Sequence, residues 1–140
     1  MATTYSNDIS GAYATPATKV SGAAVGGRLR RLRAVITLAS QADGDVVVLG
    51  KLPAGSIFAY GVLNASATLG SSTIAVGKSG TAAKYRAAAV FTAAAPTLFG
   101  TSTSVDDVPL TEEEEVILTN TTAALPSSGT LIVDLYYSAP

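Results

Sequence analysis

The sequence predicts an all-β protein, a β-sandwich or jelly roll of about eight short strands with an extended N-terminal arm. Short runs rich in Val, Ile and Thr recur at spacings of about 8 to 15 residues, as strands of such folds do. Gly and Pro turn signals separate these runs, and no long helical pattern alternates with them. The 140 residues suffice for one domain, whose core must be built mainly from Val, Ile and Leu because Trp is absent.

Residues 1–27 are predicted to form the arm, and residues 28–140 the sandwich domain. The arm is rich in Ala, Thr, Ser and Gly and shows neither a helical nor an alternating period. It can be a disordered tail, or it can order on a partner surface where new contacts offset the entropy cost. Its candidate anchors on a partner are Tyr5, Ile9 and Tyr13.

The first strand is predicted at residues 29–38, where charged and apolar residues alternate. A short helix is the alternative, because Leu29, Leu32 and Ile36 also share a helical face. A turn at residues 42–45 follows, with Asp and Gly where turn geometry favours them. Residues 45–52 and 56–65 are then predicted to form a hairpin around Pro53, Ala54 and Gly55.

Strict alternation in the second strand of that hairpin predicts two faces. One face carries Ile57, Ala59, Gly61 and Leu63, and the other carries Phe58, Tyr60 and Val62. Further strands are predicted at residues 72–76, 98–99, 115–121 and 130–138. Residues 82–88 are rich in Ala and predict a short helical turn, although Val90, Phe91 and Thr92 favour a strand.

Composition argues against an enzyme. The chain has no His and no Cys, which removes the side chains most used for acid and base catalysis near neutral pH, thiolate chemistry and transition-metal binding. We therefore expect no catalytic residues, no cofactor and no metal site, and no small-molecule ligand. The nine Lys and Arg nearly balance the ten Asp and Glu, so nucleic acid and anionic membranes are not expected partners.

A fragment of a phosphate-binding loop occurs at residues 76–79, but the glycine that this loop requires is replaced by Ser72. We interpret the fragment as a turn after a strand. Residues 1–11 lack a basic region followed by an apolar run, and no stretch of about 18 apolar residues occurs. The sequence therefore predicts a soluble protein that is not exported.

The acidic run is the first candidate contact region, and it consists of Glu112, Glu113, Glu114 and Glu115. Four consecutive carboxylates repel one another and point to alternate faces, which favours a solvated edge or contact with a basic partner. A hydrolase that uses these residues or Asp106 is the enzymatic alternative, but it needs two carboxylates held across a cleft.

The second candidate contact region is a group of arginines where the arm meets the first strand: Arg28, Arg30, Arg31 and Arg33. Arginine pairs with carboxylates in bidentate fashion and is enriched at binding hot spots. The group can contact an acidic surface of a partner or the acidic run of a neighbouring copy. A solvated strand face is the alternative.

Several segments together resemble small head proteins of tailed bacteriophages. They are DVVVLGKLPAG at residues 45–55, VLNASATLGSSTIAVG at 62–77, PLT around Leu110, VILTNTT at 116–122 and LIVDLYY at 131–137. This resemblance covers residues 28–140 and implies a capsid decoration or cement protein, often trimeric. Such a subunit sits on the outside of the shell, where it binds the major capsid protein and stabilises capsomer junctions, and it has no catalytic residues.

The resemblance thus implies a virion protein of the capsid exterior, made in the cytoplasm of the bacterial host. The alternative function is a carbohydrate- or receptor-binding jelly-roll module of a head fibre or tail. Sugar sites stack rings on exposed aromatics, and here this role would fall to Tyr60, Tyr85, Tyr136 and Tyr137 because Trp is absent.

Overall fold

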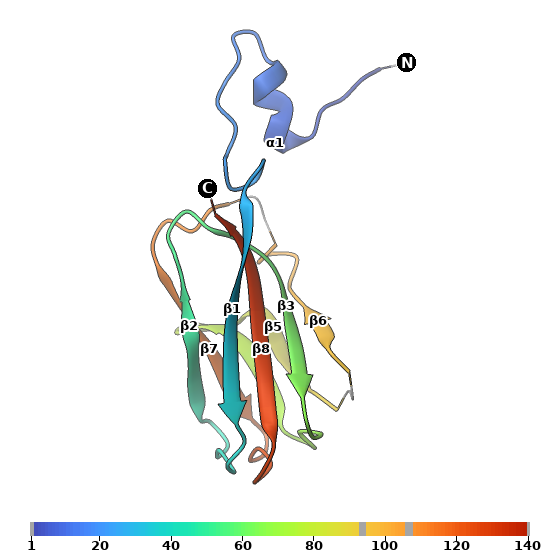
Figure 1. Ribbon diagram of the computed structural model, residues 1–140, viewed down its shortest axis with the longest axis vertical. Coiled ribbons are helices and arrows are strands. Elements are labelled where there is room, and N and C mark those ends of the chain that lie inside the picture. The colour runs from blue at the N-terminus through green and yellow to red at the C-terminus, as the bar shows by residue number, and fades with distance from the viewer. Residues whose placement is uncertain (1, 93–94, 106–107, 140) are drawn as a thin grey trace.

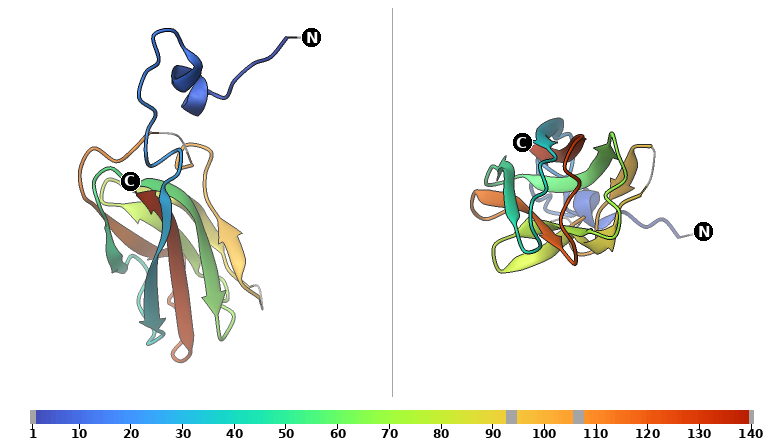
Figure 2. Two further views of the ribbon diagram at one scale, coloured as in Figure 1. Left: turned by 45° about the horizontal axis from the view of Figure 1, so that its top comes forward. Right: turned by 90° about the horizontal axis from the view of Figure 1, so that it is seen from below.

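The computed structural model describes residues 2–92, 95–105 and 108–139, with the side chains of residues 7 and 8 excepted. Eight strands form two antiparallel four-stranded sheets that pack face to face (Figures 1 and 2). One sheet has the order β1-β8-β3-β6 and the other β2-β7-β4-β5. The strands are β1 (Arg28–Thr37), β2 (Val46–Leu52), β3 (Ile57–Ala65), β4 (Thr73–Lys78), β5 (Thr81–Val90), β6 (Thr97–Phe99), β7 (Glu114–Thr121) and β8 (Thr130–Ala139). The predicted β-sandwich is confirmed.

The core lies between the two sheets and consists mainly of branched aliphatic side chains, as composition requires. Phe58 and Tyr85 add aromatic bulk, and their ring centroids lie 4.5 Å apart at the end nearer the arm. Among the largest fully buried residues are Leu52, Leu63, Ile74, Leu118, Leu131 and Leu135.

β1 is a strand along its whole length, so the helical alternative for this segment is wrong. Each residue from Arg28 to Thr37 has a partner in β8. Alternation turns Ile36 toward the core and leaves Arg33 and Val35 exposed, which is the pattern of a half-buried strand.

The predicted hairpin between β2 and β3 is wrong, because the two strands belong to different sheets. β2 pairs with β7, and β3 pairs with β8 and β6. The turn between them crosses from one sheet to the other. It is held there by Leu110, which accepts a hydrogen bond from the amide of Gly55 and donates one to the carbonyl of Ser56.

The two predicted faces of β3 are disturbed by an irregularity in its pairing with β8, between Phe58 and Tyr60. An extra residue at a bulge shifts the alternation by one position. Phe58 and Leu63 are therefore both buried, although strict alternation placed them on opposite faces.

The predicted helical turn at residues 82–88 is also wrong, because the whole segment belongs to β5. Its pairing with β4 is irregular, and the guanidinium of Arg86 fills the irregularity. Arg86 donates hydrogen bonds to the carbonyls of Ala89 at 3.1 Å and Val90 at 3.2 Å, and it also donates to the carbonyl of Ile74. Burial lowers the pKa of this guanidinium. Pairing with β4 therefore overrides the helix preference of the alanines.

The remaining local predictions are confirmed. The turn at residues 42–45 is closed by the Asp45 carboxylate, which accepts a hydrogen bond from the amide of Ala42 at 2.7 Å. β4, β6, β7 and β8 lie where strands were predicted, within two residues at each end.

Residues 2–27 lie outside both sheets and project from one end of the sandwich (Figures 1 and 2). They contain one helical turn, α1 (Asn7–Ser10), followed by the 3-10 turn Gly11–Tyr13, so the arm is not extended throughout. Its last part is fixed to the sandwich. Ala23 is buried, and its carbonyl accepts a hydrogen bond of 2.7 Å from the Ser138 hydroxyl of β8. We call the end of the sandwich from which residues 2–27 project the arm end.

Candidate partner-binding surface

One of the four candidate arginines is paired within its own sheet, although its side chain is 44% exposed. Arg33 of β1 makes a bidentate ion pair with Asp134, its cross-strand partner on β8, and both hydrogen bonds measure 2.8 Å. The hydrogen bond and charge of Asp134 raise the pKa of the guanidinium above its ordinary value. The Asp134 carboxylate is buried, and Arg33 provides its counter-charge and hydrogen bonds. The first role of Arg33 is therefore to stabilise the fold.

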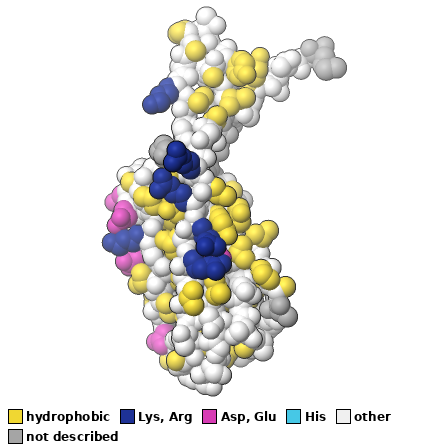
Figure 3. All heavy atoms as spheres, in the orientation of Figure 1, with side chains coloured by type: hydrophobic (Ala, Val, Ile, Leu, Met, Phe, Trp, Pro, Cys, Tyr) yellow, Lys and Arg dark blue, Asp and Glu magenta, His cyan; other side chains and the backbone are white. Residues whose placement is uncertain are grey.

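The other three arginines are exposed. Arg28, Arg30 and Arg31 form no ion pair with any residue that the structure describes. Figure 3 shows Lys and Arg side chains in a column along the face that carries β1, with hydrophobic side chains on both sides of it. We call Arg28, Arg30 and Arg31 the basic patch.

The acidic run splits in a similar way. Glu112, Glu113 and Glu115 are exposed, and Glu113 makes an exposed ion pair of 3.1 Å with Lys51 of β2. We call these three residues the acidic patch. Glu114 is only 7% exposed, so the prediction that all four carboxylates form a solvated edge or partner contact is wrong for this residue. The reason is alternation on β7, which turns Glu114 to the inner side together with Val116 and Leu118.

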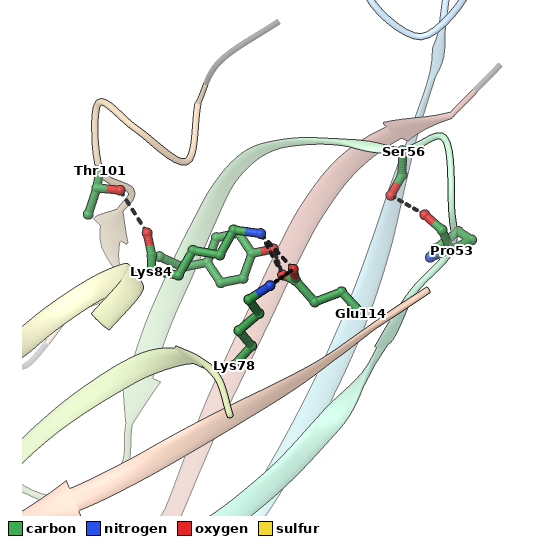
Figure 4. A network of polar contacts seen from close by, with 7 residues as sticks. Pro53, Ser56, Lys78, Lys84, Thr101 and Glu114 are labelled. Atoms are coloured by element: carbon green, nitrogen blue, oxygen red, sulfur yellow. Dashed lines mark hydrogen bonds and ion pairs between the residues drawn. The ribbon is translucent and has the colours of Figure 1, made fainter. Parts of the chain in front are cut away.

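The buried Glu114 is the centre of a polar cluster at the arm end (Figure 4). Lys84 donates hydrogen bonds to its two carboxylate oxygens at 2.9 and 2.6 Å, and Lys78 lies 3.5 Å from Oε2. The Tyr85 hydroxyl donates to Oε1. Burial raises the pKa of Glu114, but the hydrogen bonds from Lys84 and Tyr85 and the charges of both lysines lower it, and the net pKa lies below the ordinary value.

A cavity of about 240 Å³ opens beside this cluster. Its walls include Ser56, Phe58, Lys84, Leu110, Thr111 and Glu114. The one carboxylate that faces it from inside the fold is already bound by two ammonium groups and a phenol. Among the described residues, every buried side-chain nitrogen and oxygen has a hydrogen-bond partner. The geometry is that of a closed structural ion cluster at the end of the core.

The candidate anchors of the arm gather on its helical turn. The rings of Tyr5 and Tyr13 stack with centroids 4.4 Å apart and an interplanar angle of 11°. They are nevertheless 50% and 62% exposed, because the arm projects away from the sandwich. Ile9 lies between them in the chain and is half-buried. The three residues thus offer apolar surface that this copy of the chain does not cover.

The four tyrosines considered for sugar binding do not form one site. Tyr85 is buried in the core, and Tyr137 is partly buried and packs against the core. Tyr60 of β3 and Tyr136 of β8 stack on the outer face of the sheet that contains these two strands, with ring centroids 4.8 Å apart. Tyr60 is the most exposed of the four, at 37%, and Tyr136 is half-buried beside it.

The fragment of a phosphate-binding loop is a turn in the structure. Residues 76–79 end β4 and lead through a tight turn into β5, so the interpretation as a turn after a strand is confirmed. Within the described ranges, no group of three or more metal-binding side chains converges, and no helix is long and apolar enough to cross a membrane. Asp106, the other candidate acid, lies outside the described residues.

Two features of this surface were missed by the sequence analysis. The first is Asp134, the single charged residue in β8, which is in itself a signal for a buried and paired charge. The second is the Glu114 cluster. Its lysines, Lys78 and Lys84, come from β4 and β5, and no local pattern connects them with a glutamate on β7.

No protein-family model matches the chain, and no curated protein matches it. Among solved structures, its fold is similar to a chain in the capsid of Ralstonia phage GP4, with a TM-score of 0.66 and 22% identity, over 81% of this chain and 86% of that one. A chain of the cyanophage Pam1 capsid gives a TM-score of 0.67 and 19% identity, over 81% and 86% of the two chains. A chain of the acid-stable capsid of the Helicobacter pylori bacteriophage KHP30 gives 0.59 and 16%, over 80% and 88%. The sandwich described above is therefore a fold that occurs in phage capsids.

Proposed function

We propose that this chain is a structural component of a bacteriophage capsid that binds the outer surface of the shell and stabilises the junctions between capsomers. The observation that carries the proposal is the similarity of fold to chains of three phage capsids over about four fifths of the sequence. The segments at residues 45–55 and 131–137 that resemble small head proteins form β2 and most of β8. The major capsid protein is the expected partner, and a trimer the expected assembly.

The distribution of charge and apolar surface supports binding over a broad area of the shell. The polar cluster at Glu114 is closed on itself, while exposed apolar residues are spread over the arm and both sheets. A shell-bound subunit needs many modest contacts, because neighbouring copies on a lattice raise the effective concentration of each further contact. Scattered apolar positions suit such binding better than one deep site does.

The arm is the part of the chain that we assign to the shell. Tyr5 and Tyr13 are each at least half exposed, and a tyrosine buries roughly 150–250 Å² when it is fully covered. An ordered partner surface therefore gains apolar burial from the arm without any change in the sandwich. The fixed segment at Ala23 and Ser138 keeps the base of the arm at one end of the sandwich.

The position in the particle is tested by quantitative mass spectrometry and cryo-microscopy of purified virions. We expect many tens to hundreds of copies, located outside the shell at capsomer junctions. Absence from the particle, or only a handful of copies at one vertex, would contradict a decoration role. Density in the shell floor itself would assign the chain to the shell instead of its surface.

The role of the arm is tested by removing residues 2–20, which leaves the fixed segment around Ala23 in place. We expect the shortened protein to unfold at the same urea concentration as the full chain but to lose binding to particles that lack this subunit. The double substitution Tyr5→Ala and Tyr13→Ala should weaken binding in the same direction. Thr3→Ala with Thr4→Ala, two exposed positions in the same segment, is the matched control and should bind normally. Full binding by the shortened protein excludes the arm as the shell contact.

A carbohydrate-binding module is the second candidate, and one observation favours it. Tyr60 and Tyr136 lie side by side on an exposed sheet face, where a sugar ring can stack on them. Tyr85 and Tyr137, which this function would also use, are occupied by the core. Binding on a glycan array that is lost in the Tyr60→Ala variant would support this candidate, and no binding at high protein concentration would remove it.

A further inference from the structure

The structure leaves two small groups of opposite charge on one sandwich. The basic patch contributes three arginines and the acidic patch three glutamates. The fold itself uses the fourth member of each sequence group, since Arg33 binds the buried Asp134 and Glu114 binds Lys78 and Lys84. Of the six residues in the two patches, only Glu113 takes part in an ion pair within the described part of the chain, an exposed one with Lys51.

Both patches lie at the arm end of the sandwich. Arg28 begins β1, and β7 begins at Glu114, where it pairs with Leu52 at the end of β2. β1 and β2 are neighbours across the two sheets, because a Cβ on Gly50 would meet the side chain of Leu32. The two patches are thus at similar heights along the strands. Figure 3 shows acidic side chains to one side of the column of Lys and Arg. Strand alternation places Arg31 on the outer face of β1 and Glu115 on the outer face of β7, and these two strands belong to different sheets of the sandwich.

This arrangement favours a contact between copies over a contact within one copy. Among the described residues, no ion pair joins the basic patch to the acidic patch of the same chain. The two patches lie at the same height along the strands and on different sides of the sandwich. A second copy that is rotated about an axis along the strands can therefore place its acidic patch against the basic patch of the first. Such a head-to-tail contact can close into a small ring.

Each patch also has exposed apolar neighbours, which an interface of charges alone would lack. Beside the basic patch, Leu29 is 57% exposed on the outer face of β1. On the side of the acidic patch, Val48 of β2 is 57% exposed, three residues before Lys51, which is the cross-strand partner of Glu115. A protein interface commonly combines an apolar centre with a charged rim, and both sides here provide these two components.

We propose that the basic patch of one copy binds the acidic patch of a second copy, with Leu29 and Val48 contributing apolar contacts near the charges. The partner is another copy of this chain, chosen by charge complementarity. The proposal deepens the proposed function by naming the surface through which decoration subunits meet. It can be tested on free protein, so its failure would leave the capsid proposal in place.

The test is sedimentation velocity of the full chain over a range of concentrations at low and high salt. We expect reversible association that weakens as salt rises, because exposed charge pairs are screened. The triple variant Arg28→Gln, Arg30→Gln, Arg31→Gln should weaken association about tenfold or more, with no loss of folding because these side chains are exposed.

The matched control places the same change in net charge at the other end of the sandwich. Ala67→Glu, Ser127→Glu and Ser128→Glu are exposed positions near the β8 end that is remote from the arm, and they also lower the net charge by three per chain. We expect this control to associate as the wild type does. Equal weakening in both variants would show general repulsion and would overturn the assigned contact.

A charge swap decides between this contact and any other. Reversal of the basic patch to glutamate, or of the acidic patch to arginine, should abolish association when each is made alone. Both reversals in one chain should restore it, since the two surfaces are again complementary. The proposal fails if the wild type is monomeric under all these conditions, or if the sixfold variant associates no better than the single-patch reversals.

Discussion

The Tyr85 hydroxyl of β5 donates a hydrogen bond to the carboxylate of Glu114 on β7, and this contact closes the arm end of the core. Lys84 also binds that carboxylate and lies over the Tyr85 ring, 5.2 Å from its centroid. Tyr85 in turn packs on Phe58 of the opposite sheet. One acid from a run of four is therefore part of the packing between the sheets, while its three neighbours face solvent.

Glu114→Gln should lower the free energy of unfolding by about 1–3 kcal/mol, because the lysines then lose their charged acceptor next to the core. The figure is modest because Lys78 is 43% and Lys84 24% exposed, so solvent already screens part of the attraction. Urea unfolding followed by circular dichroism measures the change. Glu113→Gln and Glu115→Gln are the matched controls and should each stay within about 0.5 kcal/mol of the wild type. A cost shared equally by all three positions would show that the run acts only through its net charge.

Stability should also fall in acid through the same residue. The pKa of Glu114 is lower in the folded protein than its ordinary value of 4.5. A carboxyl group with a lowered folded pKa adds stability that is fully present above its unfolded pKa and is lost as the pH falls through its folded pKa. The difference in stability between the wild type and Glu114→Gln should therefore be constant above about pH 6 and shrink below pH 4.5. A difference that stays the same from pH 7 to pH 3 would contradict the ionic role of Glu114.

The Arg33–Asp134 pair predicts a non-additive result. Arg33→Ala leaves the buried Asp134 carboxylate without its guanidinium, which is more costly than removing both groups. The double variant with Asp134→Ala should therefore be more stable than Arg33→Ala alone. Unfolding curves of the wild type, both single variants and the double variant form the cycle that measures this coupling. Additive single effects would mean that solvent replaces Arg33 without cost.

Local sequence patterns predict the structure correctly where they agree with tertiary packing. The turn at residues 42–45 has Asp and Gly where turn geometry favours them, β1 alternates charged with apolar residues, and β8 is rich in Leu, Ile and Val. Local preference and burial therefore give the same answer for these segments. The all-β class follows from many such segments together.

Local patterns give a wrong prediction where residues distant in the sequence decide the structure. The alanines of β5 favour a helix by themselves, but β4 supplies a pairing edge and Arg86 binds its carbonyls. The turn after Leu52 resembles a hairpin turn locally, but Leu110, far along the chain, directs it to the opposite sheet. Glu114 belongs to the core only because Lys78, Lys84 and Tyr85 reach it from β4 and β5. No single segment of the sequence contains these relationships.

Gly61 and Phe99 provide a last test, because the Phe99 ring of β6 covers Gly61, its cross-strand partner on β3. A Cβ at position 61 would occupy the space of this ring, so Gly61→Ala should destabilise the protein by about 1–3 kcal/mol through overpacking. In a Phe99→Ala background the space is open, and the same substitution should cost less than about 0.5 kcal/mol or be stabilising, since alanine has less backbone freedom to lose than glycine. Urea unfolding of the four proteins measures both costs. If Gly61→Ala is equally harmful in both backgrounds, the backbone of β3, and not the ring, requires glycine at this position.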